Sequence, residues 1–264
     1  MRFAYFFTFF FFLCNVSITR AQTQVDIQSD LQSGCAPLKV TFTNASVFEA
    51  GVSYIWNFGT GAPPVQSQEA SRQIVYDNPG VYIVSLTASG SLGKITDTVT
   101  IRVFAPPIAN FSYFVRTCAP TFVDYTNSSS QGDAAIIEYK WNFGDGKYYY
   151  TPNYSKEYIA QAVYESYLKV TDANGCSSEL TQEVPVYTRP SSVFSLDTNF
   201  SCNPPLRVTA SLIEQVEPWV VYEWDFGTGA TFVVPNPNPV TYTQKGAYTI
   251  SLKASAGTTC YSQS

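Results

Sequence analysis

One aromatic, glycine-rich phrase occurs three times in this chain of 264 residues, and its repetition constrains the fold more than any other feature. The three versions are YIWNFGTG from Tyr54, YKWNFGDG from Tyr139 and YEWDFGTG from Tyr222. An active site needs its residues once, whereas a structural phrase recurs whenever its domain recurs. The tryptophans Trp56, Trp141 and Trp224 are 85 and 83 positions apart. The chain is therefore expected to repeat one domain at that period.

Short alternating runs surround each copy of the phrase. Apolar residues recur at every second position, for example at Tyr248, Ile250 and Leu252, and Gly, Pro and Asn separate the runs. Period two over short runs indicates strands and turns, and about seven such strands per repeat is typical of an immunoglobulin-like sandwich. The sequence predicts an all-β chain of three tandem immunoglobulin-like β-sandwiches. Their expected bounds are 22–104, 105–188 and 189–264, with short proline-containing linkers that favour a semi-rigid rod.

The phrase itself has a structural interpretation. Its Tyr, Trp and Phe lie two residues apart on one strand and share a face, so the Trp is expected to fill the space between two sheets. The glycines that follow suit a turn that needs positive φ. Asp145 suggests a calcium ligand, but its counterparts are Thr60 and Thr228, and no acidic cluster surrounds it. Turn chemistry is the preferred interpretation, with no metal and no cofactor.

Composition narrows the function classes. The chain has no histidine, which removes Ser-His-Asp and Cys-His catalysis and most zinc sites. A net charge of -5 without basic runs argues against nucleic acid or an anionic membrane as a partner. The acidic residues are scattered, so a glycosidase with paired carboxylates is disfavoured. These features favour a chain that is not an enzyme.

The first residues resemble a secretory signal peptide. Arg2 is followed by an apolar run from Phe3 to Leu13, and the small residues Thr19 and Ala21 precede an expected cleavage site. The run is shorter than the roughly 20 residues that a membrane span needs. The mature protein is therefore expected at the cell surface or secreted, in a compartment where cysteines can pair.

Three elements together resemble the polycystic-kidney-disease (PKD) type domain of bacterial secreted and surface proteins. They are WNFGDG in the phrase, the pattern from Pro37 to Phe42, and NPGVYIVSL from Asn78. The resemblance implies a β-sandwich used outside the cell as a spacer or adhesion module, in company with proteases, chitinases or large adhesins. The chain departs from the pattern at Ala162, where the family has Gly, and two copies have Thr in place of the second Asp.

The leading functional hypothesis is a non-catalytic extracellular spacer or adhesion module that contacts a protein or a glycan. The alternative is the accessory region of a secreted polymer-degrading hydrolase. Alignment of Cys260 with Cys176 leaves the third copy without a match to residues 180–187, so its last strand is expected to be missing. Either the chain is the N-terminal part of a larger protein, or a partner adds the strand at the sheet edge.

Two groups of aromatic residues are candidates for a ligand surface. Tyr148 and Tyr150 share a side of the segment KYYYTPNY, whereas Tyr149 points the other way. Exposed planar rings can stack on sugars or side chains, although a strand that buries alternate tyrosines in its own core gives the same pattern. Trp219 is the one tryptophan outside the phrase and is a weaker candidate of the same kind.

The cysteines predict a ladder of bonds between repeats. Cys35, Cys118 and Cys202 each precede the second strand of a copy, and Cys176 and Cys260 lie at the last hairpins of copies two and three. Within a sandwich these places are at opposite ends, separated by a strand of about seven residues or roughly 23 Å. A disulfide requires Cα atoms within about 7 Å.

The last hairpin of one copy should instead meet the first turn of the copy before it. This scheme pairs Cys35 with Cys176 and Cys118 with Cys260. It leaves Cys202 over, for a repeat beyond the end of the chain, and it explains why the first copy has Lys94 at the hairpin position. Pairing within a copy remains open if the strand order departs from the standard one.

Overall fold

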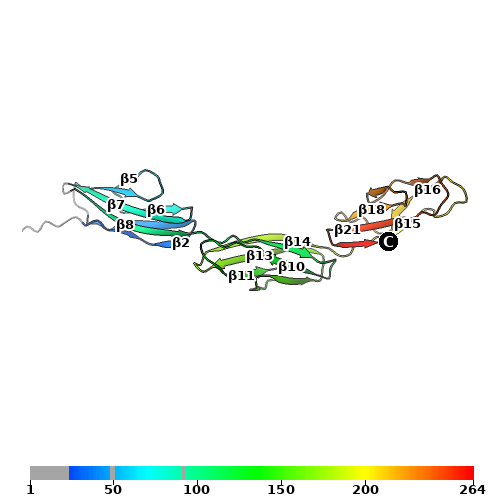
Figure 1. Ribbon diagram of the computed structural model, residues 1–264, viewed down its shortest axis with the longest axis horizontal. Helices are drawn as coiled ribbons and strands as arrows, with labels where there is room; N and C mark the ends of the chain where they lie inside the picture. The colour runs from blue at the N-terminus through cyan, green and yellow to red at the C-terminus, as the bar shows by residue number, and fades with distance from the viewer. Residues whose placement is uncertain (1–23, 48–50, 91–92) are drawn as a thin grey trace, which may run out of the picture. The chain divides into compact units, whose positions relative to one another are not determined.

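The computed structural model describes residues 24–47, 51–90 and 93–264, and all regular elements in these ranges are β-strands (Figure 1). The all-β prediction is confirmed. None of the described ranges holds a helix that is long and apolar enough to cross a membrane. The expected signal peptide, residues 1–21, lies outside the described residues. The second and third repeats belong to one compact unit, Phe104–Ser264, and the first repeat belongs to another.

The first repeat is a sandwich of a three-stranded antiparallel sheet and a five-stranded sheet. The smaller sheet has the order β1 (Ile27–Ser29), β3 (Leu38–Asn44), β6 (Ser71–Tyr76). The larger has the order β2 (Ser33–Cys35), β8 (Gly93–Phe104), β7 (Gly80–Gly90), β4 (Ser53–Asn57), β5 (Val65–Gln66). The buried side chains of both sheets form one core cluster.

The second repeat has the same plan with three strands in each sheet. One sheet has the order β12 (Tyr154–Tyr158), β10 (Thr121–Asn127), β9 (Phe111–Val115). The other has the order β11 (Ile136–Asn142), β13 (Ala162–Asp172), β14 (Ser177–Val186). The long β13–β14 hairpin holds its register over ten residue pairs, from Ala162 with Val186 to Thr171 with Ser177.

The third repeat has one interrupted layer and one continuous layer. The interrupted layer contains the pairs β15 (Phe194–Leu196) with β17 (Ala210–Leu212), and β16 (Leu206–Val208) with β20 (Val240–Tyr242). The continuous layer has the order β19 (Thr231–Val233), β18 (Val221–Asp225), β21 (Ser251–Ala256), β22 (Cys260–Gln263). The prediction that the last strand is missing was therefore wrong: the residues from Cys260 pair with β21 and form a strand of four residues, where β14 of the second repeat has ten.

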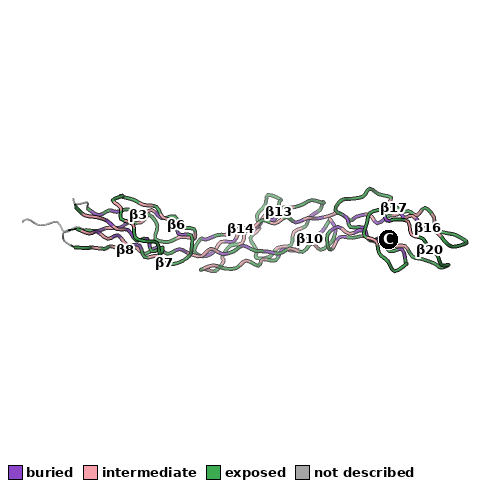
Figure 2. The backbone as a smooth tube through the Cα atoms, turned by 90° about the horizontal axis from the view of Figure 1, so that it is seen from above, coloured by how far each residue is buried: buried purple, intermediate pink, exposed green. Residues whose placement is uncertain are grey.

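The repeated phrase supplies the centre of each core, as predicted. Trp56, Trp141 and Trp224 are fully buried. Each stacks on the Phe two residues further along the same strand face, with ring centroids 5.6, 5.5 and 6.1 Å apart. Figure 2 shows how buried stretches alternate with exposed ones along the strands of each repeat. The phrase therefore recurs because each sandwich needs its own large side chains at the centre of its core.

The turn after the phrase is also built in the same way each time. The side-chain oxygens of Asn57, Asn142 and Asp225 accept hydrogen bonds from the backbone N–H two residues later, at 2.9, 2.8 and 2.7 Å. The glycines that donate these bonds have φ of 71°, 81° and 67°, a region that glycine enters without steric cost. The Asn or Asp and the Gly are thus turn residues, which confirms the structural interpretation of the phrase.

Candidate functional site

The tyrosine-rich segment of the second repeat places its rings as the alternation predicted. Tyr148 and Tyr150 are 51% and 59% exposed, whereas the ring of Tyr149 packs 5.5 Å from Phe143 and 4.5 Å from Tyr154. The segment is not a strand, since only Tyr149 pairs there, in an isolated bridge with Trp141. The two outward rings are therefore accessible, but they stand on a loop and not on a flat sheet.

One face of Tyr148 is already in contact with a cation. The Lys140 ammonium lies 4.0 Å from the centroid of that ring, a cation–π contact. Only the opposite face of Tyr148 remains for a ligand. Within the described residues no cation lies over the ring of Tyr150, and this side chain is the more exposed of the pair.

Asp145 serves the turn and an ion pair. Its carboxylate accepts hydrogen bonds from the backbone N–H of Lys147 at 3.1 Å, from the Tyr149 hydroxyl at 2.8 Å and from the Lys156 ammonium at 2.5 Å. Burial alone raises the pKa of Asp145, but the bonds from Lys156 and Tyr149 outweigh it and lower the pKa to about 2. Within the described ranges, no three His, Cys, Asp or Glu side chains gather as metal ligands would.

The most specific contact in the second compact unit is the disulfide between Cys118 and Cys260, which joins the second repeat to the third. Their Cα atoms are 4.6 Å apart and 142 positions apart in sequence. The bond rules out a pairing of Cys118 with Cys176 within the second repeat. This rung of the predicted ladder is present.

Hydrogen bonds surround that disulfide. Thr259, next to Cys260 in the last hairpin, donates its hydroxyl to the Val115 carbonyl at 2.7 Å. The backbone of Ala119, next to Cys118, donates to the Tyr187 carbonyl at 2.7 Å and pairs with Thr188 in a parallel bridge. These contacts connect the loop before β10, the linker at Tyr187 and Thr188, and the last hairpin of the third repeat. We call these three segments together the joint.

The remaining cysteines agree with the ladder in their bonding state. Cys35 and Cys176 are both disulfide-bonded, and Cys202 is free and exposed. Cys176 is positioned by its own hairpin, because the buried carboxylate of Asp172 accepts its N–H at 2.8 Å and that of Asn174 at 2.9 Å.

One detail of the ladder was wrong. In the third repeat Cys260 pairs with Ala256, and the equivalent pair in the first repeat is Gly93 with Gly90. Gly93, and not Lys94, therefore holds the hairpin position in the first repeat. Lys94 lies one residue further along and pairs with Ser89. The lengths of the hairpin loops differ between repeats, so counting along the sequence displaced the assignment by one.

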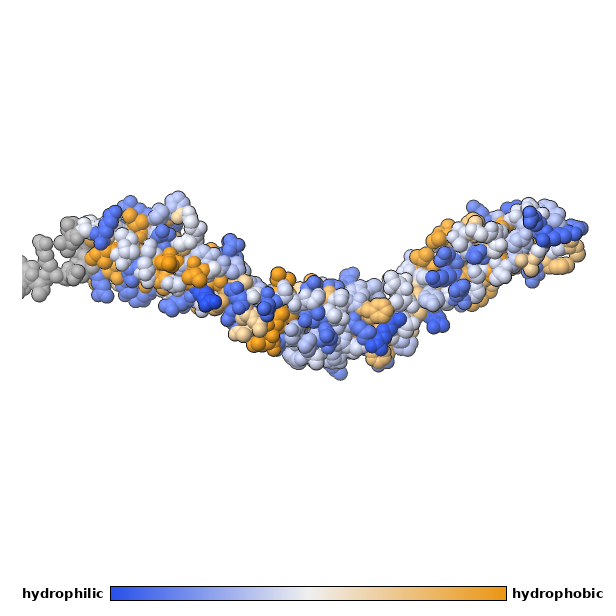
Figure 3. Space-filling view, in the orientation of Figure 1, coloured by the Kyte–Doolittle hydropathy of each residue, from blue (hydrophilic) through white to orange (hydrophobic). Residues whose placement is uncertain are grey.

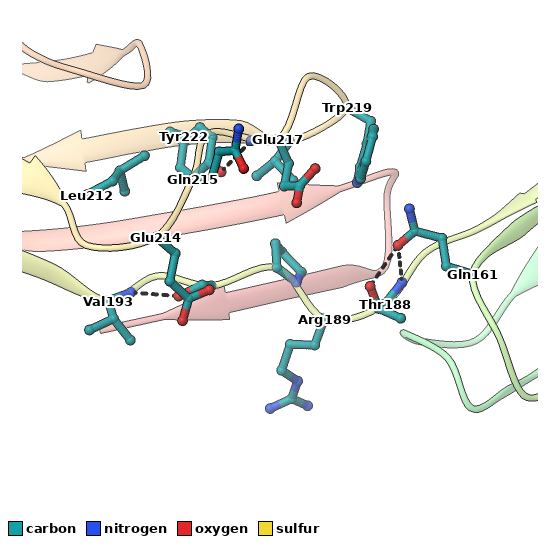
Figure 4. A pocket seen from close by; sticks show the side chains of 13 residues that line it. Gln161, Thr188, Arg189, Val193, Leu212, Glu214, Gln215, Glu217, Trp219 and Tyr222 are labelled. Carbon is teal, nitrogen blue, oxygen red and sulfur yellow. Dashed lines mark hydrogen bonds between the residues drawn. The ribbon is translucent and has the colours of Figure 1, made fainter.

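A cleft of about 350 Å³ lies beside the joint (Figure 4). Trp219 stands on the turn before β18 at one end of it and is 42% exposed. Gln161 of the second repeat lines the same cleft, and its side-chain oxygen accepts two hydrogen bonds from Thr188, at 3.1 and 2.7 Å. Other lining residues are Arg189, Glu214, Gln215, Glu217 and Tyr222.

The lining of the cleft combines the rings of Trp219 and Tyr222 and several aliphatic side chains with polar groups. The Arg189 guanidinium points away from the other labelled side chains in Figure 4, so the charged groups that remain beside the cleft are the carboxylates of Glu214 and Glu217. A further cleft, of about 430 Å³, lies in the third repeat between residues that include Phe194, Tyr242 and Ile250. Figure 3 shows hydrophobic and hydrophilic residues interspersed over the face in view. Trp219 thus lines the cleft beside the joint, whereas Tyr148 and Tyr150 do not.

Two family models for the PKD domain match the chain, one over residues 25–103 and the other over residues 104–188. The chain is a tandem PKD-domain protein. PKD domains are typically non-catalytic modules, and this membership and the disulfides fit an extracellular accessory module.

Individual relatives share only part of their length with this PKD protein. The pre-pro-metalloprotease PrtV of Vibrio cholerae is 28% identical over 139 residues, which is 50% of this chain and 14% of that protein. Human polycystin-1 is 26% identical over 106 residues, or 40% of this chain and 2% of that protein. The chain thus spans about one-seventh of PrtV and far less of polycystin-1.

Solved PKD structures include the PKD1 domain of PrtV, at 31% identity over 31% of this chain and 99% of that domain, with a TM-score of 0.29. The PKD1 domain of Vibrio anguillarum Epp is 29% identical over 31% of this chain and 95% of that domain, also with a TM-score of 0.29.

The cleft of the PKD protein was missed by sequence reasoning except for Trp219. Gln161 and Arg189 are separated from Trp219 by a whole strand or more, so no local motif unites them. The run LIEQVEPW, which contains Glu214 and Glu217, was the available signal, because a polar loop that ends in an exposed tryptophan is typical of a contact surface.

Proposed function

We propose that this PKD protein is a non-catalytic extracellular spacer and adhesion module, in which disulfides brace neighbouring repeats. The observation that carries the proposal is the bond from Cys118 to Cys260. A disulfide between neighbouring domains restricts their relative motion without adding a catalytic group, and such bonds persist outside the reducing cytoplasm. Export through a signal peptide cleaved near Ala21 is part of the proposal.

The proposal includes a second disulfide between neighbouring repeats, from Cys35 to Cys176. The separation between Cys35 and Cys176 is 141 positions, against 142 for the bonded pair Cys118 and Cys260. Each pair joins the first turn of one repeat to the last hairpin of the next. Because both Cys35 and Cys176 are disulfide-bonded, we propose that they bond to each other. The sandwich boundaries at 104–105 and 188–189 are proposed with them.

The brace is tested by measuring the spread of angles between the second and third repeats. Spin labels on two exposed threonines, Thr126 and Thr228, report the distance distribution in the mature chain by pulsed EPR. We expect Cys118→Ser with Cys260→Ser to broaden that distribution, because only the short linker and weak contacts remain. Cys202→Ser is the matched control and should leave the width unchanged. An equal width in the braced and unbraced proteins would contradict the spacer role.

A ligand-contact role is proposed for the cleft and for the tyrosine segment. The cleft offers the Trp219 ring with amides and carboxylates around it, a combination suited to a glycan or a polar protein loop. Glycan-array and protein-ligand binding should fall at least about tenfold with Trp219→Ala if the cleft is used. The pair Tyr148→Ala and Tyr150→Ala tests the other surface. Binding that survives all three changes would remove both surfaces.

A second candidate function follows from the similarity to PrtV, whose name describes a metalloprotease. The chain would then be an accessory region that holds a polymer substrate for a hydrolytic domain. The gene sequence around this region distinguishes the two, because further repeats favour an adhesin and a hydrolase domain favours the accessory role. Sedimentation of the mature protein with insoluble polymers adds a direct test, since the accessory role requires retention on at least one of them.

A further inference from the structure

The free thiol of Cys202 borders a pocket of about 210 Å³ at the end of the third repeat that does not face the joint. The pocket lies between two loops. One loop is Ser201, Cys202, Asn203 and Pro204, before β16, and the other contains Lys245 and Gly246 and ends at Tyr248. What the pocket is for can be judged from the second repeat, where the same two loops occur.

The corresponding loops of the second repeat have the same local structure. Tyr164 and Tyr248 occupy equivalent positions, stacking on Tyr158 and Tyr242 with ring centroids 4.1 and 4.2 Å apart. Their hydroxyls donate to the carbonyls of Ala160 and Gln244, each four residues earlier. By this alignment Gln161 is the counterpart of Lys245, and Cys118 is the counterpart of Cys202.

In the second repeat the space between these loops is filled by the joint. Thr188 pairs with Ala119 on one side and donates two hydrogen bonds to Gln161 on the other. Cys260 completes the contact through its bond to Cys118, while Thr259 donates to the Val115 carbonyl. The residues that match the Cys202 pocket thus contact two segments: Thr188, which follows β14 of the same repeat, and the hairpin cysteine of the next repeat.

We propose that the Cys202 pocket is a docking seat for the last hairpin of a further PKD-type domain, with Cys202 as its disulfide anchor. The observation that makes this more than an exposed thiol is that the equivalent cysteine, Cys118, is bonded in this way within the same chain. The proposal rests on the brace proposed above and adds the class of partner.

The chemistry of the seat narrows that partner. Lys245 offers only donors, whereas its counterpart Gln161 accepts hydrogen bonds from Thr188. Thr188 follows β14 of the second repeat itself, so this contact lies within one repeat and sets no condition on the hairpin of the partner. A second copy of this chain does not fit, because its hairpin cysteines Cys176 and Cys260 are already bonded and its first repeat has Gly93 at that position.

One difference separates the two seats. The chain has one more residue between Cys202 and β16 than between Cys118 and β10, since Asn203, Pro204 and Pro205 replace Ala119 and Pro120.

Bond formation follows ordinary thiol–disulfide exchange with a small-molecule disulfide as oxidant. The Cys202 thiolate attacks one sulfur of that disulfide and releases one small thiolate. The partner's cysteine thiolate then attacks the Cys202 sulfur of the mixed disulfide and releases the second. Two protein thiols are oxidised to one disulfide, the small disulfide is reduced to two thiols, and those carry the two protons.

The test is competitive capture at Cys202 on the mature chain, residues 22–264. The protein is equilibrated with glutathione, glutathione disulfide and a backbone-cyclised peptide that carries residues 254–263, the hairpin that contains Thr259 and Cys260. A cyclic peptide of the same residues in scrambled order is the competitor, and intact mass measures the occupancy of each mixed disulfide. We expect at least tenfold preference for the hairpin peptide.

A relocated thiol separates docking from mere reactivity. Cys202→Ser with Thr228→Cys moves the thiol to an exposed turn without the seat, and the preference there should fall to about one. Lys245→Ala is a second control and should leave the preference at Cys202 unchanged, because its counterpart Gln161 contacts Thr188 and not the hairpin. The proposal is overturned by equal capture of the two peptides at Cys202, or by the same preference at the relocated thiol. Neither result alters the brace, which Cys118 and Cys260 form independently.

Discussion

The first and second repeats fill the same interior position with different chemistry. Phe42 on β3 and Val84 on β7 are fully buried in the first repeat, and the equivalent positions of the second hold Tyr125 and Ser166, which are equally buried. The Tyr125 hydroxyl lies 2.7 Å from the Ser166 hydroxyl and 2.9 Å from that of Tyr158. The first repeat has neither hydroxyl at these positions, because Phe42 stands in place of Tyr125 and Val84 in place of Ser166.

The buried indoles differ in the same sense. Trp141 donates its ring N–H to the Thr151 carbonyl at 2.8 Å, whereas the ring nitrogen of Trp56 is buried without a hydrogen-bond partner. In the described part of the first repeat, the Asn44 amide nitrogen and the hydroxyls of Ser29 and Ser89 are also buried without a hydrogen-bond partner. At the position compared here the second repeat introduces the Tyr125 and Ser166 hydroxyls together, since a single buried hydroxyl without a partner is costly.

The largest expected effect comes from removing the central tryptophans. Trp56→Ala and Trp141→Ala each delete a fully buried indole, which costs about 3–5 kcal/mol of local stability. The loss in the second repeat should be larger by about 1 kcal/mol, because the Thr151 carbonyl also loses its donor. Hydrogen–deuterium exchange on β4 and β7 against β11 and β13 measures both losses, with exposed Trp219→Ala as the control. Equal losses would mean that the indole hydrogen bond contributes nothing.

An intermediate effect should come from converting the core of the second repeat to that of the first. Tyr125→Phe leaves the Ser166 hydroxyl buried without this partner and should cost about 1–3 kcal/mol. Ser166→Val should cost a similar amount, because two methyl groups must fit beside the Tyr125 hydroxyl. The double variant recreates the Phe–Val pair of the first repeat and should recover most of the loss, with a coupling of about 1 kcal/mol or more. Hydrogen exchange on β10 and β13 measures the cycle, and strictly additive losses would refute the pairing.

The sequence predicted the features that the repeats share, and it did not predict the features that differ between them. The repeated phrase predicted the burial of Trp141 and the turn that follows it, because each repeat needs the same central side chain and the same glycines with positive φ. The bond from Cys118 to Cys260 was predictable because a sandwich separates its two ends by a strand length. The Tyr125 and Ser166 pair was not, since strands β10 and β13 are far apart in sequence. The hairpin position held by Gly93 and the cleft at Trp219 depend on the lengths and paths of loops. The alternation of apolar and polar residues along strands does not encode these.

The smallest expected effect concerns the turn that differs between the repeats. The second repeat has Asp145 bonded to Lys156, whereas the first has Thr60 in the turn and Ile74 at the position of Lys156. Asp145→Thr should therefore cost at most about 1 kcal/mol at neutral pH, as is usual for a partly exposed ion pair.

The sign of its pH dependence distinguishes the ion pair from the turn. The folded pKa of Asp145 is about 2, below the ordinary value of 3.8, so the stabilisation is present above about pH 4 and is lost as the pH falls toward 2. Asp145→Thr should remove that part of the acid sensitivity, measured as hydrogen exchange on β12 between pH 2 and 5. Thr60→Asp is the matched control and should gain no such dependence, because Ile74 offers no ammonium. If Thr60→Asp acquires the same dependence as Asp145, the effect comes from the turn backbone and not from Lys156.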